Sequence, residues 1–144
     1  MKKNICLLAT LFLFCGQIAF AQERPEIGPY VEAYSGPKLE EVWMLRIGAR
    51  AANEVIIQIA GVDHEWNHSI SKCSVKKDGA TTSYVVLVND KPHTLLVKKS
   101  HTGLELHLPN EKEVIPLTYN KELSLEGNRE AFLTDYLRAQ KVEK

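Results

Sequence analysis

"EVIIQIA", residues 54–60, is the clearest β-strand signal in the chain. Val55, Ile56, Ile57 and Ile59 are β-branched, and β-branched side chains fit the pleated backbone of a strand. An Ala-Ala-Asn turn precedes this segment and a glycine follows it. The segment therefore predicts one strand, and the flanking sequence indicates whether that strand belongs to a sheet.

The segments on both sides of residues 54–60 also have strand character. On the N-terminal side, Trp43, Leu45 and Ile47 alternate with other side chains, and alternation with a period of two is typical of a strand. Further strand-like segments lie at residues 69–76, 82–88, 93–98, 104–108 and 114–119. Turn residues separate them, so the sequence predicts a mostly antiparallel β meander of about six or seven strands.

The C-terminal tail changes to a helical period. Asn128 is a suitable N-cap, and Glu130 lies in the first turn, where the helix dipole favours an acidic residue. An apolar stripe follows at spacings of three and four, formed by Phe132, Leu133, Tyr136, Leu137 and Gln140. This pattern predicts one C-terminal helix of about three turns that packs on the sheet, with presentation to a partner as the alternative. We therefore expect a single α+β domain over residues 39–144.

The N-terminus has the features of a secretory signal peptide. Lys2 and Lys3 precede an apolar run, and Ala19-Phe20-Ala21 supplies the small residues of a cleavage site. The apolar run is too short to span a bilayer. We expect residues 1–21 to be removed and the mature chain to be periplasmic. Residues 22–38 hold three prolines and two glycines, which predicts an irregular arm.

Cleavage changes the charge and the cysteine content of the chain. Removing Lys2 and Lys3 leaves 16 basic and 18 acidic residues, a net charge of −2. Without clustered positive charge, neither nucleic acid nor an anionic membrane surface is an expected partner. Two of the three cysteines leave with the leader, so Cys73 has no intrachain partner. A lone thiol of this kind is expected to be buried.

Residues 64–68, His-Glu-Trp-Asn-His, match the H-E-x-x-H motif of zinc proteases. That chemistry requires a helix, because histidines at i and i+4 share a face only at 3.6 residues per turn. The seven residues between Gly61 and Ser69 lie between two predicted strands, which leaves no room for an active-site helix. The sequence predicts a polar loop with Trp66 against the sheet, and no metal site. Metal binding by His64 and His68 is the alternative.

No motif in the chain specifies a reaction or a cofactor. It has no phosphate-binding glycine loop, CxxC, Gly-x-Ser-x-Gly or calcium loop. A small exported β-rich domain of this kind is expected to bind rather than to catalyse. The candidate contacts with a protein partner are the polar and aromatic loop residues Asp63, His64, Glu65, Trp66 and His68.

The chain resembles the small periplasmic immunity proteins that are paired with effectors of the type VI secretion system. The resemblance covers the leader at residues 1–21, the β-rich body from about 39 to 119 and the tail helix around 128–140. It implies an inhibitor that blocks a toxic periplasmic enzyme by steric occlusion, with no enzymatic activity of its own. A small-ligand carrier is the other possibility, because residues 82–88 are apolar on both faces.

Overall fold

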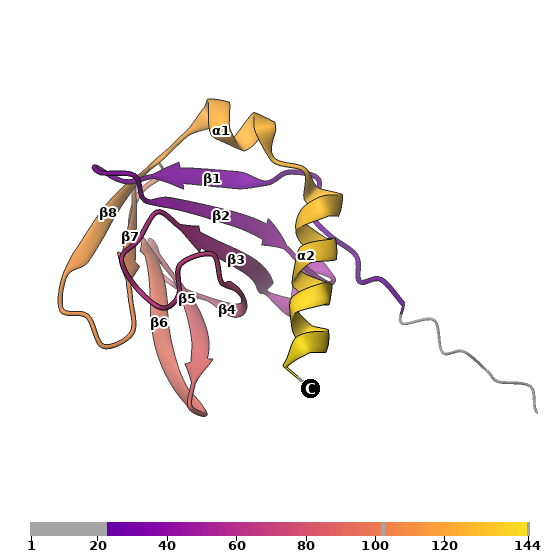
Figure 1. Ribbon diagram of the computed structural model, residues 1–144. Coiled ribbons are helices and arrows are strands. Elements are labelled where there is room, and N and C mark those ends of the chain that lie inside the picture. Colours follow the sequence, from indigo (N-terminus) through magenta and orange to yellow (C-terminus); the bar gives the residue numbers. More distant parts are fainter. Residues whose placement is uncertain (1–22, 102, 144) are drawn as a thin grey trace, which may run out of the picture.

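The computed structural model describes residues 23–101 and 103–143, and the predicted signal peptide lies outside the described residues. Within the described part, the chain forms eight strands, one 3-10 turn and two α-helices (Figure 1). These elements are β1 (Glu32–Ser35), β2 (Glu41–Arg46), η1 (Arg50–Ala52), β3 (Glu54–Ala60), β4 (Ile70–Asp78), β5 (Thr81–Val88), β6 (Lys91–Lys98), β7 (Gly103–His107), β8 (Val114–Tyr119), α1 (Lys121–Glu126) and α2 (Arg129–Val142). No helix in these ranges is long and apolar enough to cross a membrane.

Each strand pairs antiparallel with the next one in the chain, and β1 pairs with β8 to close a barrel. The predicted antiparallel order is therefore confirmed, but the prediction of six or seven strands and one helix is wrong. The missed strand is β1, which lies in the segment expected to be irregular. The missed helix is α1, a single short segment capped by the Asn120 side chain, which accepts a hydrogen bond from the Leu123 N–H.

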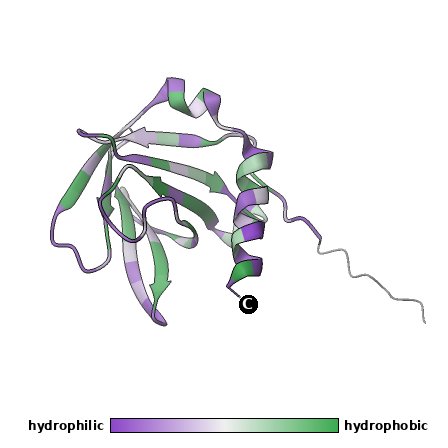
Figure 2. Cartoon of the chain, viewed as in Figure 1, coloured by the Kyte–Doolittle hydropathy of each residue, from purple (hydrophilic) through white to green (hydrophobic). Residues whose placement is uncertain are grey.

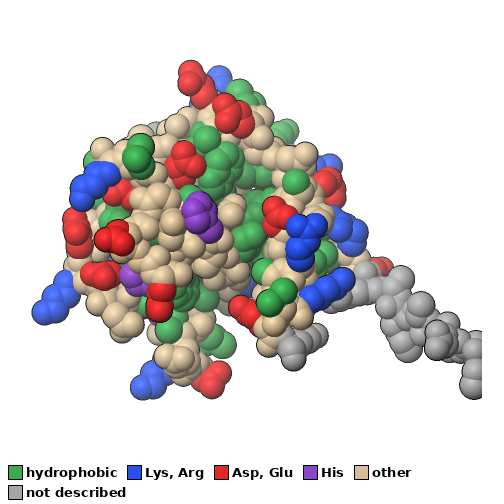
Figure 3. Space-filling model, viewed as in Figure 1, with side chains coloured by type: hydrophobic (Ala, Val, Ile, Leu, Met, Phe, Trp, Pro, Cys, Tyr) green, Lys and Arg blue, Asp and Glu red, His purple; other side chains and the backbone are tan. Residues whose placement is uncertain are grey.

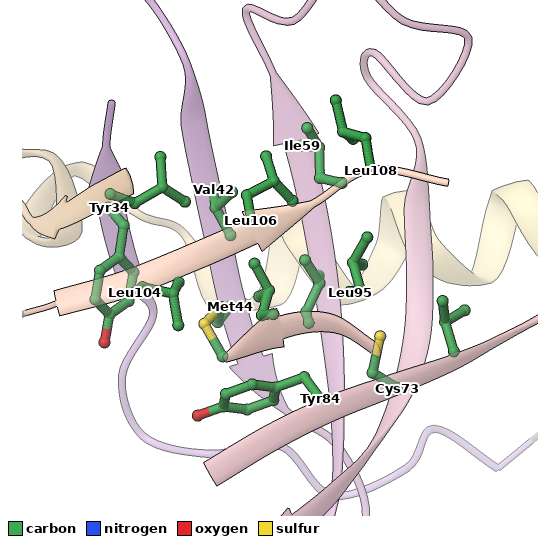
Figure 4. Close-up of a cluster of buried hydrophobic side chains, with 14 of the residues drawn as sticks. Tyr34, Val42, Met44, Ile59, Cys73, Tyr84, Leu95, Leu104, Leu106 and Leu108 are labelled. Carbon is green, nitrogen blue, oxygen red and sulfur yellow. The ribbon is translucent and has the colours of Figure 1, made fainter. Parts of the chain in front are cut away.

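The barrel interior is packed with buried side chains from all eight described strands and the loops at one end (Figure 4). This set consists of Tyr34, Val42, Met44, Ile57, Ile59, Val62, Cys73, Tyr84, Val86, Leu95, Leu96, Leu104, Leu106, Leu108 and Leu117. Hydrophobic colouring is accordingly concentrated on the strands (Figure 2). The core is a filled barrel, as expected for eight strands whose interior has room for side chains alone.

A second core lies outside the barrel, beneath α2. Phe132, Leu133 and Tyr136 of α2 pack against outward-facing residues of β2 and β3, among them Leu45 and Ile56. The predicted cap is confirmed, because the Asn128 side chain accepts a hydrogen bond of 3.0 Å from the Ala131 N–H. The predicted packing of the apolar stripe is also confirmed for these three buried residues.

The β5–β6 hairpin contains a β-bulge. Tyr84 pairs with Leu96, and Val85 pairs with Thr94, so Leu95 is the extra residue on β6. The bulge places both Leu95 and Leu96 in the barrel interior, where each is fully buried. Bulges increase the local twist and bend the strand. Beyond the bulge the end of the hairpin projects from the barrel (Figure 1).

Leu133→Ala is expected to lower the free energy of unfolding by about 2 to 5 kcal/mol, because it opens a cavity between α2 and the barrel. Leu133 is only 1% exposed. Urea unfolding followed by tryptophan fluorescence would measure the change. Leu125→Ala on α1 is the matched control, since Leu125 is 78% exposed and should cost less than about 0.5 kcal/mol. Equal losses in both variants would contradict this packing.

Candidate functional site

The loop that carries the H-E-x-x-H sequence connects β3 to β4 and starts at Gly61. Gly61 has φ of +72°, and a Cβ at this position would lie 1.9 Å from the Leu39 carbonyl oxygen. Only glycine fits both the left-handed backbone and this close approach. Gly61 therefore holds the start of the loop against the turn between β1 and β2.

Residues 64–68 form turns and not a helix, as the sequence predicts. Both ring nitrogens of His64 are used within the protein. The Trp66 N–H donates to His64 Nδ1 at 3.1 Å, and Nε2 lies 3.0 Å from the Pro109 carbonyl oxygen. These partners assign the proton to Nε2, which donates to Pro109. His64 thus links the loop to the β7–β8 connection rather than facing an open site.

The geometry of a zinc protease is not present at this loop. Catalytic zinc needs three protein ligands and an open position. Within residues 23–101 and 103–143, no group of three His, Cys, Asp or Glu side chains is placed to hold a metal ion. His68, the second histidine of the motif, is exposed and has φ of +65°, which differs from a helical backbone.

The loop forms one wall of an open groove of about 950 Å³ on the outside of the barrel. We call it the loop–helix groove. The opposite wall is the C-terminal half of α2, and the floor comes from β4 and β5. Its lining consists of Gln58, Glu65, Trp66, His68, Ser69, Ile70, Ser71, Lys72, Val86, Leu87, Asp135, Tyr136, Arg138, Ala139, Gln140, Val142 and Glu143. Figure 3 shows the hollow between the barrel and α2.

Apolar side chains lie in the groove although it is open to solvent. Leu87 is 67% exposed and Val142 is 83% exposed. Trp66 is partly buried against the barrel core, and Tyr136 is buried beneath α2. Burial raises the pKa of the Tyr136 phenol, so it stays protonated. Exposed apolar groups beside aromatic residues are typical of a binding surface.

Among the described residues, the charged side chains around the groove include two carboxylates without an ion-pair partner. Lys72 forms an ion pair with Glu54 at 3.2 Å, and Arg138 forms one with Asp135 at 3.6 Å. In the part of the chain that the structure describes, Glu65 has no cationic partner, and neither has Glu143. The unpaired charge at the groove is therefore negative.

The structure brings three of the five predicted site residues into the groove, namely Glu65, Trp66 and His68. Asp63 and His64 do not line it. The groove residues that sequence reasoning missed lie on β3, β4, β5 and α2. A signal for Leu87 was present, because residues 82–88 are apolar on both faces. The signal for α2 was the helical stripe, which extends to Gln140 beyond its buried part.

A cluster of titratable groups also lies at an end of the barrel interior. The Tyr34 hydroxyl donates to Glu32 Oε2 at 3.1 Å and accepts from Lys98 Nζ at 3.0 Å. Burial, together with the Glu32 carboxylate, raises the pKa of Tyr34 above its ordinary range. The three groups satisfy one another, which is the usual state of polar groups near a core.

No protein-family model, no curated protein and no solved structure matches the chain. The geometry of the residues is therefore the basis for a functional proposal.

Gly61→Ala is expected to destabilise the fold by about 3 kcal/mol or more, because it adds a clash with Leu39 to left-handed backbone strain. Gly79→Ala is the matched control. Gly79 also has positive φ, +59°, but a Cβ there meets nothing within 4 Å. The control should lose only about 1 kcal/mol. Thermal and urea unfolding would measure both variants, and equal losses would show that the close approach to Leu39 contributes nothing.

Cys73 is expected to be inert in the folded protein. It is 1% exposed, and burial raises the pKa of its thiol to about 12, so the thiol stays protonated at pH 8. A chromogenic disulfide reagent at pH 8 should react with residues 22–144 only after unfolding in guanidinium. Rapid modification of the native protein would contradict this burial.

Proposed function

We propose that the chain is an exported, non-enzymatic binding protein that inhibits a partner protein through the loop–helix groove. An immunity protein that blocks a toxic periplasmic enzyme is the form of this function that we favour. The observation that carries the proposal is the convergence of Trp66, Tyr136 and exposed Leu87 in one open groove with a polar rim. Aromatic anchors inside a polar rim are typical of protein interfaces.

The filled barrel supports a protein partner over a carrier role inside the sheet. The interior positions that a lipid-sized ligand would occupy hold buried side chains, among them Leu95, Leu96 and Leu106. The groove on the outside is the alternative place for a small ligand, and its volume of about 950 Å³ lies in the range of known ligand sites. A small-ligand function at the groove is therefore the second candidate.

Steric occlusion needs a surface that keeps its shape when it binds. The loop is held at Gly61 by close packing and at His64 by two hydrogen bonds. The Ser69 hydroxyl adds a bond of 2.6 Å to the Trp66 carbonyl oxygen. A loop fixed in advance loses little conformational entropy on binding, so more of the contact energy contributes to affinity. These contacts support an inhibitor that covers a catalytic cleft as a rigid body.

Immobilised residues 22–144 can be used to capture proteins from envelope and secreted fractions. We expect one enzyme to be retained, and we expect the protein to inhibit that enzyme at a one-to-one ratio. The tag belongs at the N-terminus, because Glu143 lines the groove. Trp66→Ala and Leu87→Ala should each weaken binding and inhibition about tenfold or more, as expected for anchors at the centre of an interface.

Leu125→Ala is the control for this experiment, since Leu125 is exposed on α1 and lies outside the groove lining. It should bind as tightly as the unmodified chain. Unchanged affinity of both groove variants for the captured enzyme would remove the groove from the proposal. A captured small molecule seen by native mass spectrometry, with no protein, would favour the second candidate.

A further inference from the structure

The β4–β5 ladder stops before the two strands end. Its register runs from Asp78↔Thr81 to Ser74↔Val85. However, β4 continues back to Ile70, and β5 continues forward to Val88. Residues 70–73 and 86–88 therefore have no partner in the β4–β5 register, and the loop–helix groove lies at this split in the barrel wall.

The direction in which the N–H and C=O groups of β4 point follows from its pairing with β3. The Val75 N–H donates to the Asn53 carbonyl oxygen at 2.7 Å, and the Ser69 carbonyl oxygen accepts from the Ile59 N–H at 3.3 Å. Odd-numbered residues of β4 therefore bond to β3. Since successive backbone groups of a strand point to opposite sides, the N–H and C=O of Lys72 point to the side of β5. No strand meets them there within the described residues.

The direction in which the N–H and C=O groups of β5 point follows from the hairpin turn between β5 and β6. Asn89 and Asp90 form a two-residue turn with φ of 51° and 63°, which is the type I′ geometry. In such a hairpin the flanking residues Val88 and Lys91 form the hydrogen-bonded pair. Leu87 is opposite Pro92, so its N–H and C=O point away from β6 and toward the groove.

The bulge at Leu95 coincides with the split. Without it, the next hydrogen-bonded pair after Ser74↔Val85 would be Lys72 with Leu87. The bulge lies opposite Tyr84 and Val85, at the place where the β4–β5 register ends. The extra twist that a bulge introduces turns the end of the hairpin away from β4. Two strand edges are thereby exposed on either side of one groove.

Resting on the proposed function, we propose that the loop–helix groove binds an extended segment of the partner protein by β-strand addition. Alternating N–H and C=O groups of an extended backbone are the complement of the edges at Lys72 and Leu87. The apolar lining accepts alternate side chains of that segment. Because Glu65 and Glu143 have no cationic partner among the described residues, the segment carries basic residues between its apolar ones.

The test uses a fluorescein-labelled hexapeptide amide of alternating lysine and valine, titrated into residues 22–144 up to about 1 mM and followed by anisotropy. Amide NMR shifts should map its binding to Lys72 and Leu87. A peptide with glutamate in place of lysine should bind about tenfold more weakly. A peptide N-methylated at the central valine keeps its side chains but loses one donor, and should bind about fivefold more weakly.

Protein variants separate the main-chain contact from the side-chain contact. Leu87→Pro removes the N–H that points into the groove, at a position whose N–H is not needed for pairing with β6. Leu87→Ala keeps that N–H and shortens only the side chain. Leu87→Pro should bind the peptide at least about fivefold more weakly than Leu87→Ala. Unchanged dispersion of the NMR spectrum would show that both variants fold.

Three results would overturn strand addition. They are equal binding of the peptide by the two Leu87 variants, unchanged affinity of the N-methylated peptide, and no binding at about 1 mM. A dimer in which the Lys72 and Leu87 amides are protected from hydrogen exchange would also overturn it, since a second copy of the chain would then occupy the edge. These outcomes leave the proposed function standing if a captured enzyme is still inhibited. The proposed function fails separately if no inhibited partner is captured, whatever the peptide does.

Discussion

Ile56 and Ile57 are consecutive residues of β3 and both are fully buried, Ile57 inside the barrel and Ile56 beneath α2. Because successive side chains point to opposite faces of a strand, β3 must be covered on both sides. This requirement places α2 across the outside of the barrel wall. Phe132, Leu133 and Tyr136 of α2 meet the requirement, and the end of α2 from Arg138 onward extends beyond the second core to become a wall of the groove.

Local patterns predicted most of the strands, and the bounds of β3 and β8 match the sequence interpretation, because alternation and turn residues act over a few positions. Closure could not be predicted in this way. It depends on two residue pairs, Tyr34↔Tyr119 and Ser35↔Thr118, between segments far apart in the chain. A four-residue strand between Pro29 and Pro37 gives little local signal of its own. β1 pairs with only Thr118 and Tyr119 of β8, so residues 114–117 of β8 have no partner in the β1–β8 register.

The candidate site shows the same division between local and distant information. The loop with Trp66 could be found from composition alone, because a tryptophan among charged residues between two predicted strands is typical of a loop at a binding surface. The groove beside it could not, because its lining combines the loop with β4, β5 and a helix at the far end of the chain. The sequence showed that the strand with Leu87 has two apolar faces. The exposure of Leu87 lies where β5 has no partner in the β4–β5 register, which the sequence did not show.

The short β1–β8 pairing also has a consequence for folding, because it joins strands at the two ends of the barrel sequence. Contacts between residues 34 and 119 close a loop of nearly the whole domain, so their entropic cost is the largest in the barrel and they form late. A chain synthesised from its N-terminus can pair β1 to β7 in sequence, but the pairs between β1 and β8 cannot form until residue 119 has been made. During that interval the growing sheet has free edges, and a chaperone or a neighbouring copy can occupy them.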